Sequence, residues 1–174
     1  MVAIKNILFF ITAASALSIG RRDTSTVLSD ISTIDSDVKS LTSAVNNYNG
    51  GLLAAIPIEN SESALEQAIT KGTNDAQATS QLSTEDTQTV IAAVDNLSPD
   101  IQAALVALVN KKSQFTSAGL KSTVQKDLAN LKADTDDFAD ALIAIASDDS
   151  KSAANDRKAT IDGYFATAIN AYNS

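Results

Sequence analysis

Apolar residues recur at steps of three and four along almost the whole of this 174-residue chain. That spacing places them on one side of a helix, whereas a half-buried strand would need strict alternation. Proline occurs only at Pro57 and Pro99, and glycine is rare, so few positions interrupt a helix. The spacing therefore predicts an all-α fold, in which about five amphipathic helices pack as an up-and-down bundle.

The first two helices follow from their apolar stripes and from the residues that end them. A helix over about residues 26–48 ends at Asn49-Gly50-Gly51, because glycine readily takes the left-handed conformation of a helix terminus. Residues 52–58 then form an apolar connector or a broken first turn. A second helix is expected over about residues 61–81, although Gly72-Thr73-Asn74-Asp75 at its centre has low helix propensity.

The remaining helices are separated by recognisable start and stop signals. Ser83 begins the third helix, with an acid three residues later, and Ser98-Pro99-Asp100 is expected to restart it before Phe115. Gly119 marks the next break. The last two helices are expected over about residues 120–146 and 151–172.

The amino-terminal 22 residues have the pattern of a targeting segment. Lys5 precedes a short apolar run, and Ala14-Ser15-Ala16 offers the small residues that a signal peptidase accepts. The run is shorter than the roughly 20 residues needed to span a bilayer, so we predict a signal peptide; a buried helix is the alternative. Arg21-Arg22 is either a dibasic processing site or a charge pair at a frayed terminus. We expect residues 1–22 to be a signal peptide with a short propeptide, and residues 23–174 to form one secreted domain without a transmembrane segment.

The chain contains no cysteine, histidine or tryptophan. Zinc sites built on histidine or cysteine, thiol nucleophiles and catalytic triads with a histidine base are therefore excluded. Asp134, Asp136, Asp137 and Asp140 form a local acidic cluster, which we interpret as a solvated helix face and not as a metal site. The sequence accordingly predicts no cofactor, no metal and no enzymatic activity.

The formal net charge is −8 at pH 7, from 21 acidic and 13 basic residues. Removal of residues 1–22 would take away three basic residues and no acid, which makes the charge more negative. Nucleic acids and anionic membrane surfaces both require clustered lysine or arginine. The overall charge therefore argues against both as partners.

The apolar stripes allow two interpretations of the interior. They can pack on one another as a dry core, as amphipathic stripes usually do, or they can enclose a cavity for an apolar ligand. Small residues on the second helix and a sparse aromatic set would leave room for a cavity, although a dry core is the more usual outcome for such stripes. Composition and periodicity leave both interpretations open.

Three stretches of the chain carry a pattern more specific than amphipathicity. They are Val27-Leu28-Ser29-Asp30-Ile31 through Tyr48, Leu97-Ser98-Pro99-Asp100-Ile101 through Phe115, and Gly119-Leu120 through Leu142. In these stretches the chain resembles the fungal hydrophobic surface-binding protein A family, which includes cell-wall galactomannoproteins with lipid-binding domains. The resemblance covers essentially all of residues 23–174.

The resemblance implies a secreted or wall-associated protein that binds fatty acids in a central apolar tunnel. It also implies adsorption to hydrophobic surfaces and help in recruiting secreted hydrolases there. Carried over to this chain, Tyr164 becomes the candidate hydroxyl for a fatty-acid head group, because a tyrosine can donate a hydrogen bond inside an apolar pocket. The candidate ligand-binding residues are Leu41, Leu105, Leu108, Phe115, Leu128, Leu142, Tyr164 and Phe165.

Two functional hypotheses follow. In the first, the bundle takes up fatty acids or similar apolar ligands in its interior. In the second, the bundle opens and lays its apolar faces on a hydrophobic surface as a structural protein. The chain shows neither the long Ser/Thr-rich tail nor the anchor signal of the mannoprotein members, so a soluble form is expected.

Overall fold

The computed structural model describes the backbone of residues 13–174 and the side chains from Thr24 onward. No strand occurs in the described chain, which confirms the all-α prediction. The elements in chain order are α1 (Ala13–Asn47), the 3-10 turn η1 (Leu53–Ala55), α2 (Ile56–Ala78), α3 (Thr84–Asn110), α4 (Lys112–Ser117), α5 (Lys121–Ile145) and α6 (Lys151–Asn173).

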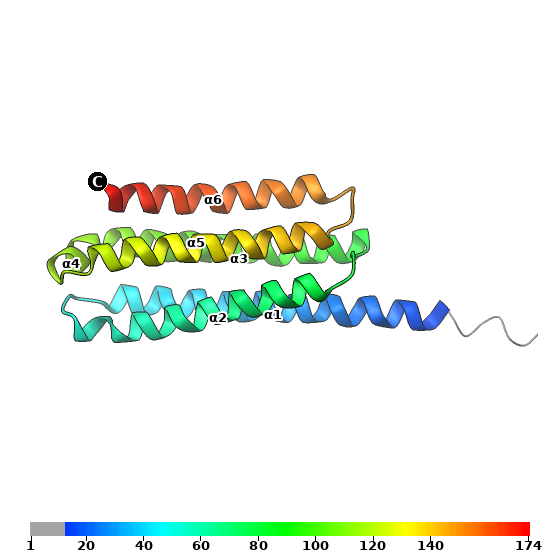
Figure 1. Ribbon diagram of the computed structural model, residues 1–174, viewed down its shortest axis with the longest axis horizontal. Helices are drawn as coiled ribbons and strands as arrows, with labels where there is room; N and C mark the ends of the chain where they lie inside the picture. The colour runs from blue at the N-terminus through cyan, green and yellow to red at the C-terminus, as the bar shows by residue number, and fades with distance from the viewer. Residues whose placement is uncertain (1–12) are drawn as a thin grey trace, which may run out of the picture.

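The five long helices run alternately up and down, with their connections at alternate ends of the bundle (Figure 1). Their neighbours in space are not simply their neighbours in sequence. Helix α1 packs against α2 and α3, α2 also packs against α5, and α6 packs against both α5 and α3. The extensive contacts therefore form a closed ring in the order α1, α2, α5, α6, α3, and the apolar stripes face its centre.

Local sequence accounts for most helix boundaries. Ser83 caps α3: its Oγ accepts a hydrogen bond from the backbone N–H of Asp86 at 3.1 Å and donates one to the Asp86 carboxylate at 2.8 Å. Helix α2 begins at Ile56, earlier than predicted, because Pro57 lies in its first turn where no backbone N–H is required. Helix α1 is already helical at Ala13, the first described residue and well before the predicted start at about residue 26. The predicted signal peptide falls partly on residues 1–12, outside the described residues.

The predicted interruption of α3 at Ser98-Pro99-Asp100 is wrong. Helix α3 continues through Pro99 without a break. Proline costs the helix one backbone hydrogen bond, but Leu97 and Ile101 on either side are both buried in the core. Burial of this apolar face holds the helix together across the proline.

Helix α3 is also long and apolar enough to cross a bilayer, judged by length and composition alone. The core helix of a bundle passes the same test. In this structure α3 packs against α1 and α6, and its buried residues include Val90, Leu105 and Leu108.

Gly72 explains how α2 tolerates its low-propensity centre. A Cβ atom at this position would lie 3.0 Å from Cε2 of Phe138 on α5 and 3.5 Å from Cβ of Asp30 on α1. The absent side chain lets the Phe138 ring lie directly against the α2 backbone. Helix α2 thus gives up helix propensity for close packing against two neighbours.

We predict that Gly72→Leu lowers the free energy of unfolding by about 1–3 kcal/mol, because the larger side chain overpacks the contact with Phe138. Denaturant unfolding followed by circular dichroism measures the change.

Gly163→Leu is the matched control, because nothing lies within 4 Å of a Cβ atom at that helical position. It should raise stability by about 0.5–1 kcal/mol through helix propensity alone. Equal effects at the two positions would contradict the packing role of Gly72.

Candidate functional site

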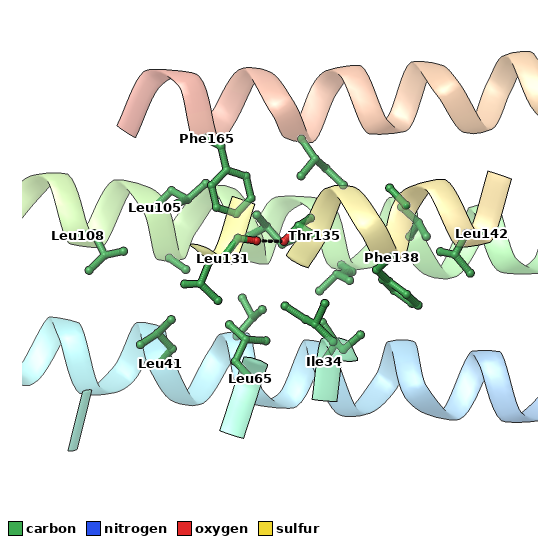
Figure 2. Close-up of a pocket in the computed structure, with 18 residues that line it drawn as sticks. Ile34, Leu41, Leu65, Leu105, Leu108, Leu131, Thr135, Phe138, Leu142 and Phe165 are labelled. Carbon is green, nitrogen blue, oxygen red and sulfur yellow. Dashed lines mark hydrogen bonds between the residues drawn. The ribbon is translucent and has the colours of Figure 1, made fainter. Parts of the chain in front are cut away.

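A cavity of about 80 Å³ lies at the centre of the helix ring. Each of the five long helices contributes to its wall, and Figure 2 shows the labelled side chains pointing toward a common space. The lining residues are Ile34, Val38, Leu41, Leu65, Ile69, Val94, Leu97, Ile101, Ala104, Leu105, Leu108, Leu131, Thr135, Phe138, Ala139, Leu142, Ile161 and Phe165.

The wall of this central cavity is apolar apart from one hydroxyl. Thr135 is the single polar side chain among the lining residues, and none of them is charged. Its Oγ1 donates a hydrogen bond of 2.6 Å to the backbone carbonyl of Leu131, one turn earlier on α5 (Figure 2). Because its hydrogen is already donated, the cavity presents no free hydrogen-bond donor. The space is suited to a hydrocarbon and not to a polar group.

Two further spaces adjoin the central cavity. One of about 50 Å³ extends toward the α5–α6 connection and shares Val94, Ala139, Leu142 and Ile161 with it. The other is a groove of about 130 Å³ between α3 and α6, which shares Leu105. The central cavity thus has one apolar neighbour toward the α5–α6 connection and one at the surface between α3 and α6, where Gln102 and Val106 are exposed.

The structure brings Leu41, Leu105, Leu108, Leu142 and Phe165 of the predicted site residues together around the central cavity. Their contact with a ligand stays a prediction. Tyr164 lies elsewhere, in the groove between α3 and α6, beside Gln102, Val106, Val109 and Thr167.

Phe115 and Leu128 do not line the central cavity. Phe115 stacks on Tyr48 with ring centroids 4.5 Å apart, and both rings are fully buried. Tyr172 lies at the same end of the bundle and donates a hydrogen bond of 2.8 Å to the Leu108 carbonyl. Burial raises the pKa of Tyr172, so its hydroxyl stays protonated. These three aromatic residues, the aromatic plug, close one end of the ring.

Several lining residues, such as Leu65 and Ile69 on α2 and Leu131 on α5, were not among the predicted site residues. Periodicity placed most of them on apolar stripes. It could not tell which members of a stripe face the centre of the ring and which lie between two adjacent helices, since that depends on the order of the helices in space. Within residues 24–174, no group of three or more acidic residues gathers in a way that could hold a metal ion.

The sequence matches the family described as "Hydrophobic surface binding protein A" over residues 24–144. The chain belongs to this family. Cell wall mannoprotein 1 of Aspergillus flavus is 28% identical over 132 residues, covering 76% of this chain and 48% of that protein. Cell wall mannoprotein 1 of Aspergillus fumigatus is 30% identical over 104 residues, covering 60% of this chain and 36% of that protein. The chain thus spans about half, or less, of the length of these relatives.

Solved structures share the fold of this family member. The crystal structure of AFMP4P in complex with palmitic acid is 40% identical, with a TM-score of 0.83, and covers 86% of this chain and 99% of that one. Ligand binding domain 1 of the Penicillium marneffei MP1 protein, complexed with arachidonic acids, has a TM-score of 0.81 at 15% identity and covers 86% and 98% of the two chains. The second likeness shows the fold alone. Both of these solved structures are complexes with fatty acids.

Ion pairs fasten four of the five contacts between neighbouring helices in this family member. Lys71 of α2 contacts the buried Asp30 of α1 at 2.6 Å, and Arg157 of α6 contacts Asp95 of α3 at 3.0 Å. The α5–α6 contact carries pairs such as Lys132–Asp162 at 2.9 Å, and the α1–α3 contact carries Lys39–Asp100 at 3.4 Å. Between α2 and α5, residues 24–174 form no ion pair.

Carboxylates instead face one another along the contact between α2 and α5. Burial raises the pKa of Glu62 on α2 to about 7, and the charges of Asp127, Glu66 and Glu59 add to the shift. Burial and the charge of Glu66 likewise raise the pKa of Asp127 on α5, which the neighbouring Lys126 only partly opposes. This contact is held by apolar packing against electrostatic repulsion.

We predict that stability falls as the pH rises from about 5 to 7. Over this window the native state holds a proton on Glu62 that the unfolded chain, with a carboxyl pKa near 4.5, has already released. Acidification therefore stabilises the fold until the pH approaches the ordinary aspartate range, near 3.8, where the unfolded chain begins to take up protons that carboxyls with a lowered pKa, such as Asp136 and Asp149, do not yet bind in the native state. Melting temperatures measured across the pH series test this slope.

Glu62→Gln should flatten the slope between pH 5 and 7, because the glutamine carries no titrating proton. The same change at the exposed Glu85, in the first turn of α3, should leave the slope in place. An unaltered slope in the Glu62 variant would contradict this assignment.

Proposed function

We propose that this chain takes up the hydrocarbon tail of a fatty acid, or of a similar apolar ligand, at the centre of its helix ring. The observation that carries the proposal is the central cavity, which five helices enclose and which presents no charge and no free donor. The palmitic acid complex of a relative that is 40% identical over nearly its whole length supports it.

The cavity must widen to hold such a ligand. Sites for drug-sized ligands have volumes of about 300–1,000 Å³, whereas the central cavity measures about 80 Å³. Even with the two adjoining spaces, the packing contacts between them would have to open. The contact between α2 and α5 is the one to give way, because it lacks ion pairs and sets carboxylates against one another. Ligand uptake is then a movement of α2 away from α5, with the other four contacts kept.

The carboxylate head of the ligand stays outside the central cavity, where no donor would receive it. The acidic residues along α2 and α5 would repel it on that side. The groove between α3 and α6 is more suitable, since it joins the central cavity at Leu105 and its lining residues include no acid. Tyr164 offers a hydroxyl in this groove and is the proposed contact for the head group.

The protein acts by binding and not by catalysis, and the names of its relatives support this assignment. We further propose that residues 1–22 direct secretion and are removed, and that the protein works outside the cell or at the cell wall, as the mannoprotein relatives suggest. Adsorption of the opened bundle to hydrophobic surfaces, with recruitment of secreted hydrolases, is the second candidate function. The name of the family supports it.

Delipidated protein should gain stability when palmitate is added, by about 2.7 kcal/mol at a free concentration 100-fold above Kd. Native mass spectrometry of the secreted protein should also show a bound lipid. An unchanged melting temperature together with a ligand-free mass would overturn the proposal.

We predict that Ala139→Leu weakens palmitate binding about tenfold. Ala139 lines both the central cavity and the adjoining space, so a leucine there occupies the path of the tail. Overpacking costs about 1–3 kcal/mol, and about 1.4 kcal/mol corresponds to a factor of ten in affinity. Titration with a fluorescent fatty acid measures the effect.

Ala129→Leu is the control for this variant, because Ala129 lies on the exposed face of the same helix. It makes the same chemical change and should leave the affinity unaltered. A loss of binding in both variants would show a general effect on α5 and not a blocked cavity.

We predict that Tyr164→Phe weakens palmitate binding about tenfold, because a hydrogen bond to a charged group contributes about 1.5–3 kcal/mol. Methyl palmitate, whose neutral ester carbonyl accepts only a weaker hydrogen bond, should lose less affinity than the acid does. Competition titrations with the acid and the ester separate the two contributions. Equal loss for both ligands would mean that Tyr164 acts through packing alone.

A further inference from the structure

The acidic residues of this chain are absent from three segments that meet at one end of the bundle. Residues 38–58, 101–126 and 163–174 contain no aspartate or glutamate. Hydrogen bonds join the three segments: the Lys111 ammonium donates to the Tyr48 carbonyl at 2.7 Å, and the Lys112 ammonium donates to the Ala171 carbonyl at 2.7 Å. Figure 1 shows this end, where the α1–α2 connection, α4 and the end of α6 lie together.

The basic residues that form no ion pair lie at this same end. Among residues 24–174, the cations that pair with a carboxylate are Lys39, Lys71, Lys132, Lys151, Arg157 and Lys158. Lys111, Lys112, Lys121 and Lys126 form no ion pair in this part of the chain. These four lysines lie on α4, at its junction with α3, and in the first turns of α5. Positive charge therefore gathers at one end of a strongly acidic protein.

The same end carries an exposed apolar tip. Gly50 and Gly51 have φ angles of +103° and +93°, which turn the chain out of α1 and into η1. Leu52 is 65% exposed, Leu53 is 80% exposed and Ile56 is 47% exposed. The other large apolar side chain exposed among residues 24–174 is Val106, on the side of the bundle. The tip thus exposes apolar side chains to water, and their transfer into an apolar environment would be favourable.

We propose that this end of the intact bundle docks on a lipid bilayer that carries anionic head groups. Leu52, Leu53 and Ile56 enter the boundary between head groups and acyl chains, and the four lysines without an ion pair supply the positive charge that attracts the anionic head groups. Helices of 23 to 27 residues, such as α2 and α3, are about 35–40 Å long. The acids at the far end then lie several Debye lengths, of about 8 Å each, from the surface.

The contact suits a lipid surface better than a second copy of the chain. Stable protein interfaces bury about 800 Å² on each partner, more than three exposed apolar side chains supply. A dimer joined through this end would also bring two sets of unpaired lysines together. Glu59 is exposed in the first turn of α2, about one turn beyond Ile56, whereas Glu62 and Asp127 lie further along α2 and α5. Insertion of Leu52 and Leu53 does not require contact with any of these acids.

Flotation with vesicles tests the docking, because it measures attachment of the protein and not the uptake of single lipid molecules. The full chain should float with vesicles of phosphatidylcholine containing about one third phosphatidylserine, and more weakly with phosphatidylcholine alone. Leu52→Ser with Leu53→Ser should lower the partition coefficient at least about tenfold. Val106→Ser is the matched control, since it removes an exposed apolar side chain from the side of the bundle.

A second pair of variants tests how much the lysine charge contributes to vesicle binding. Lys121→Gln should weaken binding about fivefold, in line with the usual contribution of one lysine near an anionic surface. Lys39→Gln removes a lysine that is already paired with Asp35 and Asp100 and should have no effect. Circular dichroism spectra identical to that of the wild type establish that the variants are folded.

Three flotation results would overturn the proposal. They are no flotation of the wild type, equal flotation with and without phosphatidylserine, and flotation unchanged by the double serine variant. A dimer in solution that the double serine variant dissociates would assign the tip to a second copy and would also overturn it. Palmitate titration without vesicles keeps this question apart from the cavity, because the docking variants should bind palmitate normally whether or not docking occurs.

Discussion

Each long helix in this structure has to bury an apolar stripe against two neighbours at once. Closing five such helices into a ring satisfies all five stripes, and the extensive contacts follow the ring order α1, α2, α5, α6, α3. Residues at the edges of a stripe pack between adjacent helices, whereas residues in its middle point to the axis. The central cavity is a direct result, since side chains of ordinary size do not completely fill the axis of a five-membered ring.

Charged residues are distributed unevenly, both around this ring and along its axis. Ion pairs connect every neighbouring pair of helices except α2 and α5, where the half-buried carboxylates of Glu62 and Asp127 oppose the apolar packing. The unpaired lysines and the exposed Leu52 and Leu53 gather at one end. Net charge alone argued against anionic surfaces, because it averages over an uneven distribution. The structure shows that the lysines without ion pairs and most of the acidic residues lie in different parts of the bundle, a separation that the net charge does not report.

The sequence predicts the helices well because their stripes and caps are local signals. Ser83 caps α3 as expected, and Leu41 and Phe165, which were assigned to the site through the family resemblance, face the central cavity. Features that depend on distant neighbours are not predictable in this way. Continuation of α3 through Pro99 depends on burial against α1 and α6, and placement of Phe115 in the aromatic plug depends on Tyr48, which lies just beyond the end of α1. The order of the helices around the ring is not encoded in any local sequence pattern.

The hydroxyl of Thr135 has a consequence for the choice of ligand. Because it is committed to the Leu131 carbonyl, nothing inside the cavity fixes a bound chain at one position along the axis. Apart from the head-group contact proposed at Tyr164, discrimination between tails then rests on length, bend and thickness, and chains that differ by one or two methylene groups compete on nearly equal terms. A protein of this construction would hold a mixed population of lipids that reflects their supply, and burial of their tails would appear as a negative heat-capacity change on binding.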